Sequence, residues 1–125
     1  MIFGIGTDLV EVSRVEKILQ KWGDKFLTKV YSQNEIDYCK KKAFPSIHFA
    51  ARFAVKESFL KSLGIGLGMG VNLRDIEVVN NQQGSPVLNV HESIKARLDN
   101  LGINKIHISI THTREHAQAI VVLEK

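Results

Sequence analysis

Two carboxylates and a histidine stand in this sequence among residues that are mostly apolar. On a helical wheel of about 100° per residue, Glu57 falls in the middle of an apolar stripe, with Lys61 close beside it. Asp8 ends an apolar segment, and His112 continues an alternating apolar one. Because a charged side chain is seldom buried unless it is paired or binds a ligand, these residues are candidates for chemistry.

The two carboxylates indicate a divalent cation. Mg²⁺ prefers hard oxygen ligands and fills its remaining positions with water and phosphate oxygens, whereas the spacing of Cys and His that zinc requires is absent. Structural interpretations remain open for both residues. Glu57 and Lys61 are placed at i, i+4 and can form an ion pair, and Thr7 with Asp8 can form a turn or a cap.

The segment ISITHT holds the third candidate. Alternation places His112 on the same strand face as its apolar neighbours, Ile106, Ile108 and Ile110, and places His107, Ser109 and Thr111 on the other face. His112 is then either a ligand-binding residue or a structural residue at the edge of the core. The remaining histidines are interpreted as structural or solvated: His48, His91, His107 and His116.

Periodicity and turn residues predict the elements that must position these side chains. Strands are expected at 2–10, 73–79, 87–90, 103–111 and 117–124, and helices at 12–22, 33–42, 47–63 and 92–100. Ser32 and Glu35 form a capping box for the second helix, Ser46 can cap the third, and Gly64 ends it. Because short turns join most strands and the helices are grouped, we expect an α+β fold with a largely antiparallel sheet, in one domain spanning 1–125.

Composition and motif order exclude several classes of protein. The longest apolar run, 119–123, is far shorter than the roughly 20 residues of a membrane-spanning helix. The glycines between 64 and 70 follow a helix, so they match neither a dinucleotide fingerprint nor a P-loop, and a helix stop and flexible loop are expected. A single cysteine, Cys39, and an N-terminus without a basic leader indicate a cytoplasmic protein.

The net charge of +4 favours an anionic partner. Aromatic residues make up only 7% of the chain and no Arg-rich run accompanies them, so nucleic acid is the weaker candidate. A basic stripe spans about 80° of arc if the first helix continues past Gly23: Arg14, Lys17, Lys21 and Lys25. Such a stripe is either a solvated face or a dock for an acidic helix.

Four blocks of this sequence resemble the holo-[acyl-carrier-protein] synthases, a family of 4'-phosphopantetheinyl transferases. They are GIGTDLVEVSR (4–14), ARFAVKESFLKSLG (51–64), GSP (84–86) and SITHT (109–113). The order and separation of the blocks also agree. The resemblance implies a cytosolic homotrimer with the α+β 4'-phosphopantetheinyl transferase fold and active sites at subunit interfaces. It further implies transfer of phosphopantetheine from coenzyme A to a serine of apo acyl carrier protein, for fatty acid biosynthesis.

The resemblance also assigns roles to individual residues. It implies that Asp8 and Glu57 bind Mg²⁺, with Lys61 beside them, and that His112 reaches the coenzyme A phosphates from a neighbouring subunit. It places Arg52, Gly84, Ser85 and Pro86 near coenzyme A and Arg14 on the surface that meets the acidic carrier, although the family often has Lys where Ser85 stands. Mg²⁺ would neutralise charge on the β-phosphate while Lys61 and His112 assist. Either Glu57 or a metal-bound water can take the proton of the attacking serine.

Two other functions compete with this one. A Mg²⁺-dependent phosphohydrolase would use the same two carboxylates with water as the nucleophile. A basic domain that binds nucleic acid would use Arg14, Lys17, Lys21 and the run 40–42, with an affinity that falls steeply with salt. Neither explains why a carboxylate and His112 occupy apolar faces.

Overall fold

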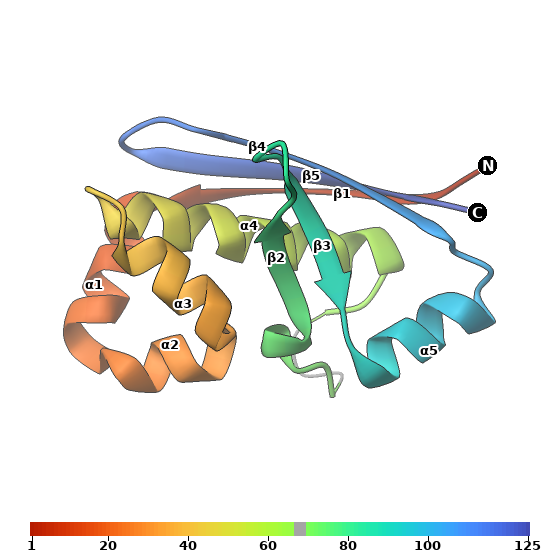
Figure 1. Ribbon diagram of the computed structural model, residues 1–125, viewed down its shortest axis with the longest axis horizontal. Coiled ribbons are helices and arrows are strands. Elements are labelled where there is room, and N and C mark those ends of the chain that lie inside the picture. Colours follow the sequence, from red (N-terminus) through yellow and green to blue (C-terminus); the bar gives the residue numbers. More distant parts are fainter. Residues whose placement is uncertain (67–69) are drawn as a thin grey trace.

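The computed structural model describes residues 1–66 and 70–125. Its elements, drawn in Figure 1, are β1 (Ile2–Glu11), α1 (Val12–Trp22), α2 (Asp24–Val30), α3 (Gln33–Lys40), α4 (Pro45–Leu63), the 3₁₀ turn η1 (Leu73–Asp75), β2 (Ile76–Asn80), β3 (Pro86–Val90), α5 (Glu92–Asn100), β4 (Lys105–His112) and β5 (His116–Glu124). One sheet has the order β1-β5-β4 and the other is the hairpin β2-β3, and every pairing is antiparallel. The predicted α+β class with antiparallel sheets is confirmed.

Helix α4 lies along the three-stranded sheet, with α1, α2 and α3 at one end of the molecule and α5 at the other (Figure 1). Gly4 and Gly6 of β1 allow this close approach. A Cβ on Gly4 would lie 2.0 Å from the carbonyl oxygen of Ser62, and one on Gly6 would lie 1.9 Å from that of Ser58. The Ser58 hydroxyl also donates a hydrogen bond to the carbonyl of Ala119 in β5, over 3.1 Å. The sheet and α4 thus bury their facing apolar side chains in one hydrophobic core.

A buried ion pair joins α4 to the elements around it. The Lys56 ammonium lies 2.8 Å from the Glu35 carboxylate of α3, and both side chains are fully buried. Lys56 also donates to the carbonyls of Leu73 and Ile76, while Glu35 accepts from the backbone N–H of Val78. Because all three donors of the ammonium are used, the pair is fully satisfied inside the protein.

Local signals in the sequence explain several element boundaries. The capping box of Ser32 and Glu35 is present at the start of α3, as predicted. Gly64 ends α4 with φ 75, also as predicted, although 67–69 of the expected flexible loop lie outside the described residues. Among the helices of the described chain, none is both long and apolar enough to cross a membrane.

Other boundaries differ from the expectation. Pro45 occupies the first turn of α4, so Ser46 lies inside the helix and is not its cap. Gly23 has φ 53 and ends α1, so the first helix does not continue and Lys25 belongs to the separate helix α2. Strand β1 runs on to Glu11, one residue beyond the expected 2–10 and three beyond Asp8, because it stays paired with β5 as far as His116.

Candidate active site

Asp8, Glu57 and Lys61 form one group, here named the carboxylate cluster, where β1 crosses α4. The Lys61 ammonium lies 3.1 Å from the Asp8 carboxylate and donates to the Thr7 carbonyl over 3.0 Å. The i, i+4 spacing had allowed an ion pair between Glu57 and Lys61. Instead, Lys61 pairs with Asp8. Because an ammonium has three donors and these are its two hydrogen bonds within the described chain, one donor remains for a ligand.

Glu57 is the unsatisfied member of the carboxylate cluster. Its Oε1 atom is buried and, within the described residues, has no hydrogen-bond partner. Burial and the negative charge of Asp8 raise the pKa of Glu57 above its ordinary value of 4.5, and Lys61 only partly offsets them. A buried carboxylate oxygen without a donor, facing a second carboxylate, is the arrangement that a divalent cation relieves.

Two of the residues predicted near coenzyme A, Arg52 and Gly84, belong to a second group, here named the arginine cluster and defined by Tyr38, Arg52, Asn80 and Gly84. The Arg52 guanidinium donates to Asn80 Oδ1 over 3.1 Å and lies over the Tyr38 ring, 4.0 Å from its centroid. The Asn80 amide in turn donates to the Gly84 carbonyl over 3.0 Å, and Pro86 then begins β3. Arg52 is only 4% exposed, and its buried Nε has no partner within the described chain.

A buried arginine is ordinarily paired with a carboxylate. Within the described chain the partners of Arg52 are a neutral amide and an aromatic ring, and none of the salt bridges found there includes it. The arginine cluster therefore has the donors and the positive charge to bind an anion.

His112 is the last residue of β4, where it is exposed, and its ring contacts that of His48 on α4 with centroids 5.6 Å apart. The structure places it with the arginine cluster and away from the carboxylate cluster. His48 and Arg52 lie about 180° and 140° around the helix from Glu57, at 100° per residue. Within one chain, α4 thus separates the predicted site residues into two groups on opposite sides.

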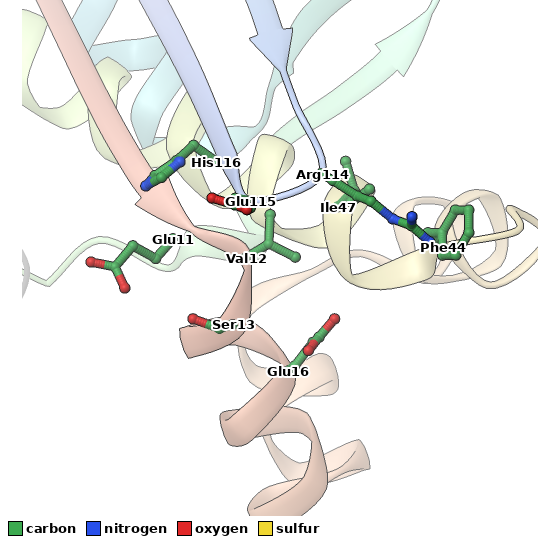
Figure 2. A pocket seen from close by; sticks show the side chains of 9 residues that line it. All are labelled: Glu11, Val12, Ser13, Glu16, Phe44, Ile47, Arg114, Glu115 and His116. Atoms are coloured by element: carbon green, nitrogen blue, oxygen red, sulfur yellow. The ribbon is translucent and has the colours of Figure 1, made fainter.

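A cavity of about 610 Å³ lies near the start of α1 and is shown in Figure 2. Its lining includes Glu11, Glu16 and Glu115, while the Arg114 guanidinium lies over the Phe44 ring, 4.6 Å from the centroid. None of the predicted site residues lines it. Three carboxylates make this cavity unsuited to a polyanion, so we do not place the active site there.

Two contributors to these groups were missed in the sequence. Tyr38 and Asn80 carry no local signal, because each contacts Arg52 from a position that is 14 or 28 residues away in the chain. Lys56 did carry one, since apolar residues lie three or four positions from it on the same face of α4: Phe53, Phe59 and Leu60. That signal indicates a buried ion pair and not a ligand site.

Comparison with known proteins identifies the family of this chain. The model of the 4'-phosphopantetheinyl transferase superfamily matches residues 4–121. The holo-[acyl-carrier-protein] synthase of Syntrophus aciditrophicus is 56% identical, covering 99% of this chain and 97% of its own length. The crystal structure of the Neisseria meningitidis synthase has a TM-score of 0.92 at 30% identity and covers 100% of both chains. That of the Helicobacter pylori synthase in complex with coenzyme A has a TM-score of 0.84 at 32% identity, covering 96% of this chain and 99% of its own.

The family match over 4–121, together with an α+β fold of this strand order, therefore defines a 4'-phosphopantetheinyl transferase. Within that superfamily, the chain belongs to the holo-[acyl-carrier-protein] synthases and is an enzyme of that family.

Proposed function

We propose that this enzyme transfers 4'-phosphopantetheine from coenzyme A to a serine of apo acyl carrier protein, with Mg²⁺ as cofactor, in fatty acid biosynthesis. The products are holo acyl carrier protein and adenosine 3',5'-bisphosphate. The observation that carries the proposal is the carboxylate cluster, in which Glu57 keeps a buried oxygen without a donor while Lys61 is held on Asp8. The Helicobacter pylori relative, whose structure contains coenzyme A, supports the choice of donor.

The carboxylate cluster fits Mg²⁺. Asp8 and Glu57 supply hard oxygen ligands, and the described residues hold no larger group of metal-binding side chains, so other coordination positions remain for water and phosphate. When bound, Mg²⁺ would neutralise charge that develops on the β-phosphate of coenzyme A. Lys61 would direct its remaining donor to a phosphate oxygen, because Asp8 and Thr7 hold the ammonium in place.

The arginine cluster would bind the nucleotide part of coenzyme A. Arg52 supplies a charge that forms no salt bridge with a carboxylate of the described residues, and Asn80 fixes both this guanidinium and the Gly84 carbonyl. The turn is itself held, since the Asn81 carboxamide oxygen accepts the backbone N–H of Ser85 over 3.0 Å. His112, exposed at the end of β4, adds a donor for a phosphate oxygen.

The separation of the two clusters supports an active site shared between subunits. Since α4 keeps the carboxylate cluster and His112 on opposite sides of one chain, a neighbouring copy must supply the other half if one coenzyme A is to meet both. The outer sheet face carries the apolar surface that such an interface requires, with Ile5 58%, Leu9 63% and Ile120 42% exposed. A homotrimer with three shared sites follows as part of the proposal.

The partner protein would dock on α1. Arg14, Lys17 and Lys21 are exposed on this helix, which begins directly after the strand that carries Asp8. An acidic carrier bound there would bring its serine toward the carboxylate cluster.

The free, buried Cys39, whose thiol pKa is raised to about 12 mainly by burial, is compatible with a reducing cytoplasm.

The decisive experiment is to incubate the protein with coenzyme A, Mg²⁺ and an apo acyl carrier protein, and then to weigh the carrier by mass spectrometry. A gain of one phosphopantetheine group, with release of adenosine 3',5'-bisphosphate, is the expected result. Release of inorganic phosphate without any change in the carrier would instead identify a phosphohydrolase and overturn the proposal.

A further inference from the structure

Four basic side chains meet around Tyr38 and form what is here named the cation cluster: Lys42, His48, Arg52 and His112. The Lys42 ammonium lies 4.6 Å from the centroid of the Tyr38 ring, and the Arg52 guanidinium 4.0 Å. The His48 ring is 6.1 Å from that of Tyr38 and 5.6 Å from that of His112, both edge to face. His48 is therefore at the centre of the cluster, half-buried between the tyrosine and the second imidazole.

The cation cluster has no negative charge of its own. Within the described chain, no salt bridge joins any of its members to a carboxylate. The groups that face His48 are Tyr38 from α3, Lys42 from the following segment, Arg52 from its own helix and His112 from β4. All of these are neutral or positive. A charged His48 would also lie four residues from Arg52 on the same helix, and like charges at this spacing destabilise a helix.

The protonation of His48 reflects this environment. Burial, and then the positive charges of His112, Lys42 and Arg52, lower its pKa below the ordinary value of 6.5. The uncharged imidazole of His48 is therefore favoured in the ligand-free protein. An anion placed against the cluster would raise the pKa of His48 again. It would favour the charged imidazole, which His112, Lys42 and Arg52 now disfavour.

We propose that His48 is a phosphate-binding residue of the coenzyme A site and that it takes up a proton from solvent when a phosphate of the nucleotide binds. The inference rests on the proposed function, since it takes coenzyme A as the substrate. It extends that function to a residue whose sequence context indicated only a structural or solvated histidine. Coenzyme A should consequently bind more tightly as the pH falls through the range in which His48 titrates in the free and bound protein.

The test measures binding of adenosine 3',5'-bisphosphate by calorimetry in two buffers of different ionisation enthalpy. The wild-type protein should take up protons near pH 6.5, and His48→Phe, which keeps an aromatic ring beside Tyr38, should take up fewer. The substitution should weaken binding roughly tenfold at pH 6 and little at pH 8, because only the charged imidazole adds a charge-assisted hydrogen bond. His107→Gln is the matched control, since His107 lies on the same strand as His112 but bonds to Glu124.

A second measurement does not depend on the variant. Nuclear magnetic resonance of the His48 ring in the wild-type protein should show its pKa rising when the bisphosphate is added. An unmoved His48 pKa, or a His48→Phe protein with wild-type proton uptake and pH dependence, would overturn the inference.

The carrier-modification assay separates this inference from the proposed function. Binding with proton uptake that depends on His48, but without transfer to the carrier, would support the phosphate role and overturn the proposed function. Transfer to the carrier, together with wild-type proton uptake and pH dependence in the His48→Phe protein, would support the proposed function and overturn the phosphate role of His48. Failure of the wild-type protein to bind the bisphosphate would overturn both.

Discussion

Lys61 of α4 binds Asp8 of β1 across 3.1 Å, although Glu57 lies one turn away on its own helix. The choice has an electrostatic consequence. Asp8 is paired with Lys61, whose ammonium also donates to the Thr7 carbonyl, while Glu57 keeps a raised pKa and a buried oxygen without a donor in the described chain. The ion pair thus leaves one carboxylate in need of a cation.

Glu57→Gln should abolish metal binding and lower the rate of transfer by roughly a hundredfold or more. Mutation of a residue that only orients a metal ligand already lowers metal affinity or activity by about 10- to 100-fold, and Glu57 would itself be a ligand. The metal-free variant should be at least as stable as the wild type, because the substitution removes a partly buried charge that Asp8 repels. Mn²⁺ titration followed by electron paramagnetic resonance, together with thermal unfolding without metal, measures both effects. Asp99→Asn, at an exposed carboxylate of α5, is the control. Normal Mn²⁺ binding by Glu57→Gln would show that the metal site is misplaced.

Metal binding should also release a proton at acidic pH. The pKa of Glu57 is raised above 4.5 by burial and by Asp8, and a cation requires the ionised form. Affinity for Mn²⁺ should therefore rise with pH from 4.5 up to the raised pKa, and then level off. Without metal the sign is opposite: the folded protein holds this proton more tightly than the unfolded chain, so the contribution of Glu57 to stability is lost as pH rises through that window. Calorimetry in paired buffers should detect the proton, and equal heats in both buffers would contradict the prediction.

Gly6→Ala should destabilise the protein by about 3 kcal/mol or more, because the new Cβ would lie 1.9 Å from the Ser58 carbonyl and neither backbone can yield cheaply. The strain should also move Asp8 away from Lys61 and Glu57, since β1 carries it. Urea unfolding and Mn²⁺ binding of the folded fraction would test the two parts. Gly66→Ala is a fair control, because a Cβ there would meet no atom of the described residues within 4 Å. Equal unfolding midpoints for the two variants would argue against close packing at Gly6.

The sequence predicts local features of this molecule well and distant pairings poorly. The Ser32 and Glu35 capping box depends on residues three apart, and it forms as expected. The sequence does not predict whether the first helix ends at Gly23. The separate helix that follows, Asp24–Val30, has too few residues for a clear periodic pattern. Asp8 with Lys61 is a pairing across 53 residues, which depends on how β1 crosses α4.

Lys56 shows what a single apolar context can and cannot indicate. A lysine within an apolar helix must find a partner, but Glu35, its partner, was already explained by its role in the cap. One carboxylate performs both tasks, since Oε1 accepts from the Ser32 N–H and from Lys56. The second role becomes visible only when α3 and α4 are packed together.

Lys56→Met should cost about 3–5 kcal/mol of stability, because it leaves the Glu35 charge buried without its cation. Adding Glu35→Gln should recover part of the loss, since a neutral amide removes the unpaired charge and its single oxygen can still accept from one of the two N–H groups that Glu35 binds, that of Ser32 or that of Val78. Chemical unfolding of the two single variants and the double variant supplies the cycle. Strictly additive losses would mean that the pair is not coupled.

The last prediction concerns the two halves of the active site. Glu57→Gln disables the carboxylate cluster and His112→Ala the opposite side of α4, so each variant alone should be inactive. Mixed through reversible dissociation, they should form sites in which a His112→Ala subunit supplies an intact Glu57 and a Glu57→Gln subunit an intact His112. Random mixing of equal amounts gives about one intact site in four, and activity should recover to that fraction.

The matched control for this mixture is Glu57→Gln with Lys61→Ala. Both residues belong to the carboxylate cluster, so no exchange of subunits can place an intact Glu57 and an intact Lys61 in the same cluster. That mixture should stay inactive under the conditions in which the first recovers. Native mass spectrometry would confirm the exchange of subunits in both. Two results would contradict the shared site: exchange without recovery in the first mixture, or sedimentation of the fully active protein as a monomer. Either would place the whole site in one chain, Asp8, Glu57, Lys61 and His112, and would require α4 or β4 to move from the positions seen here.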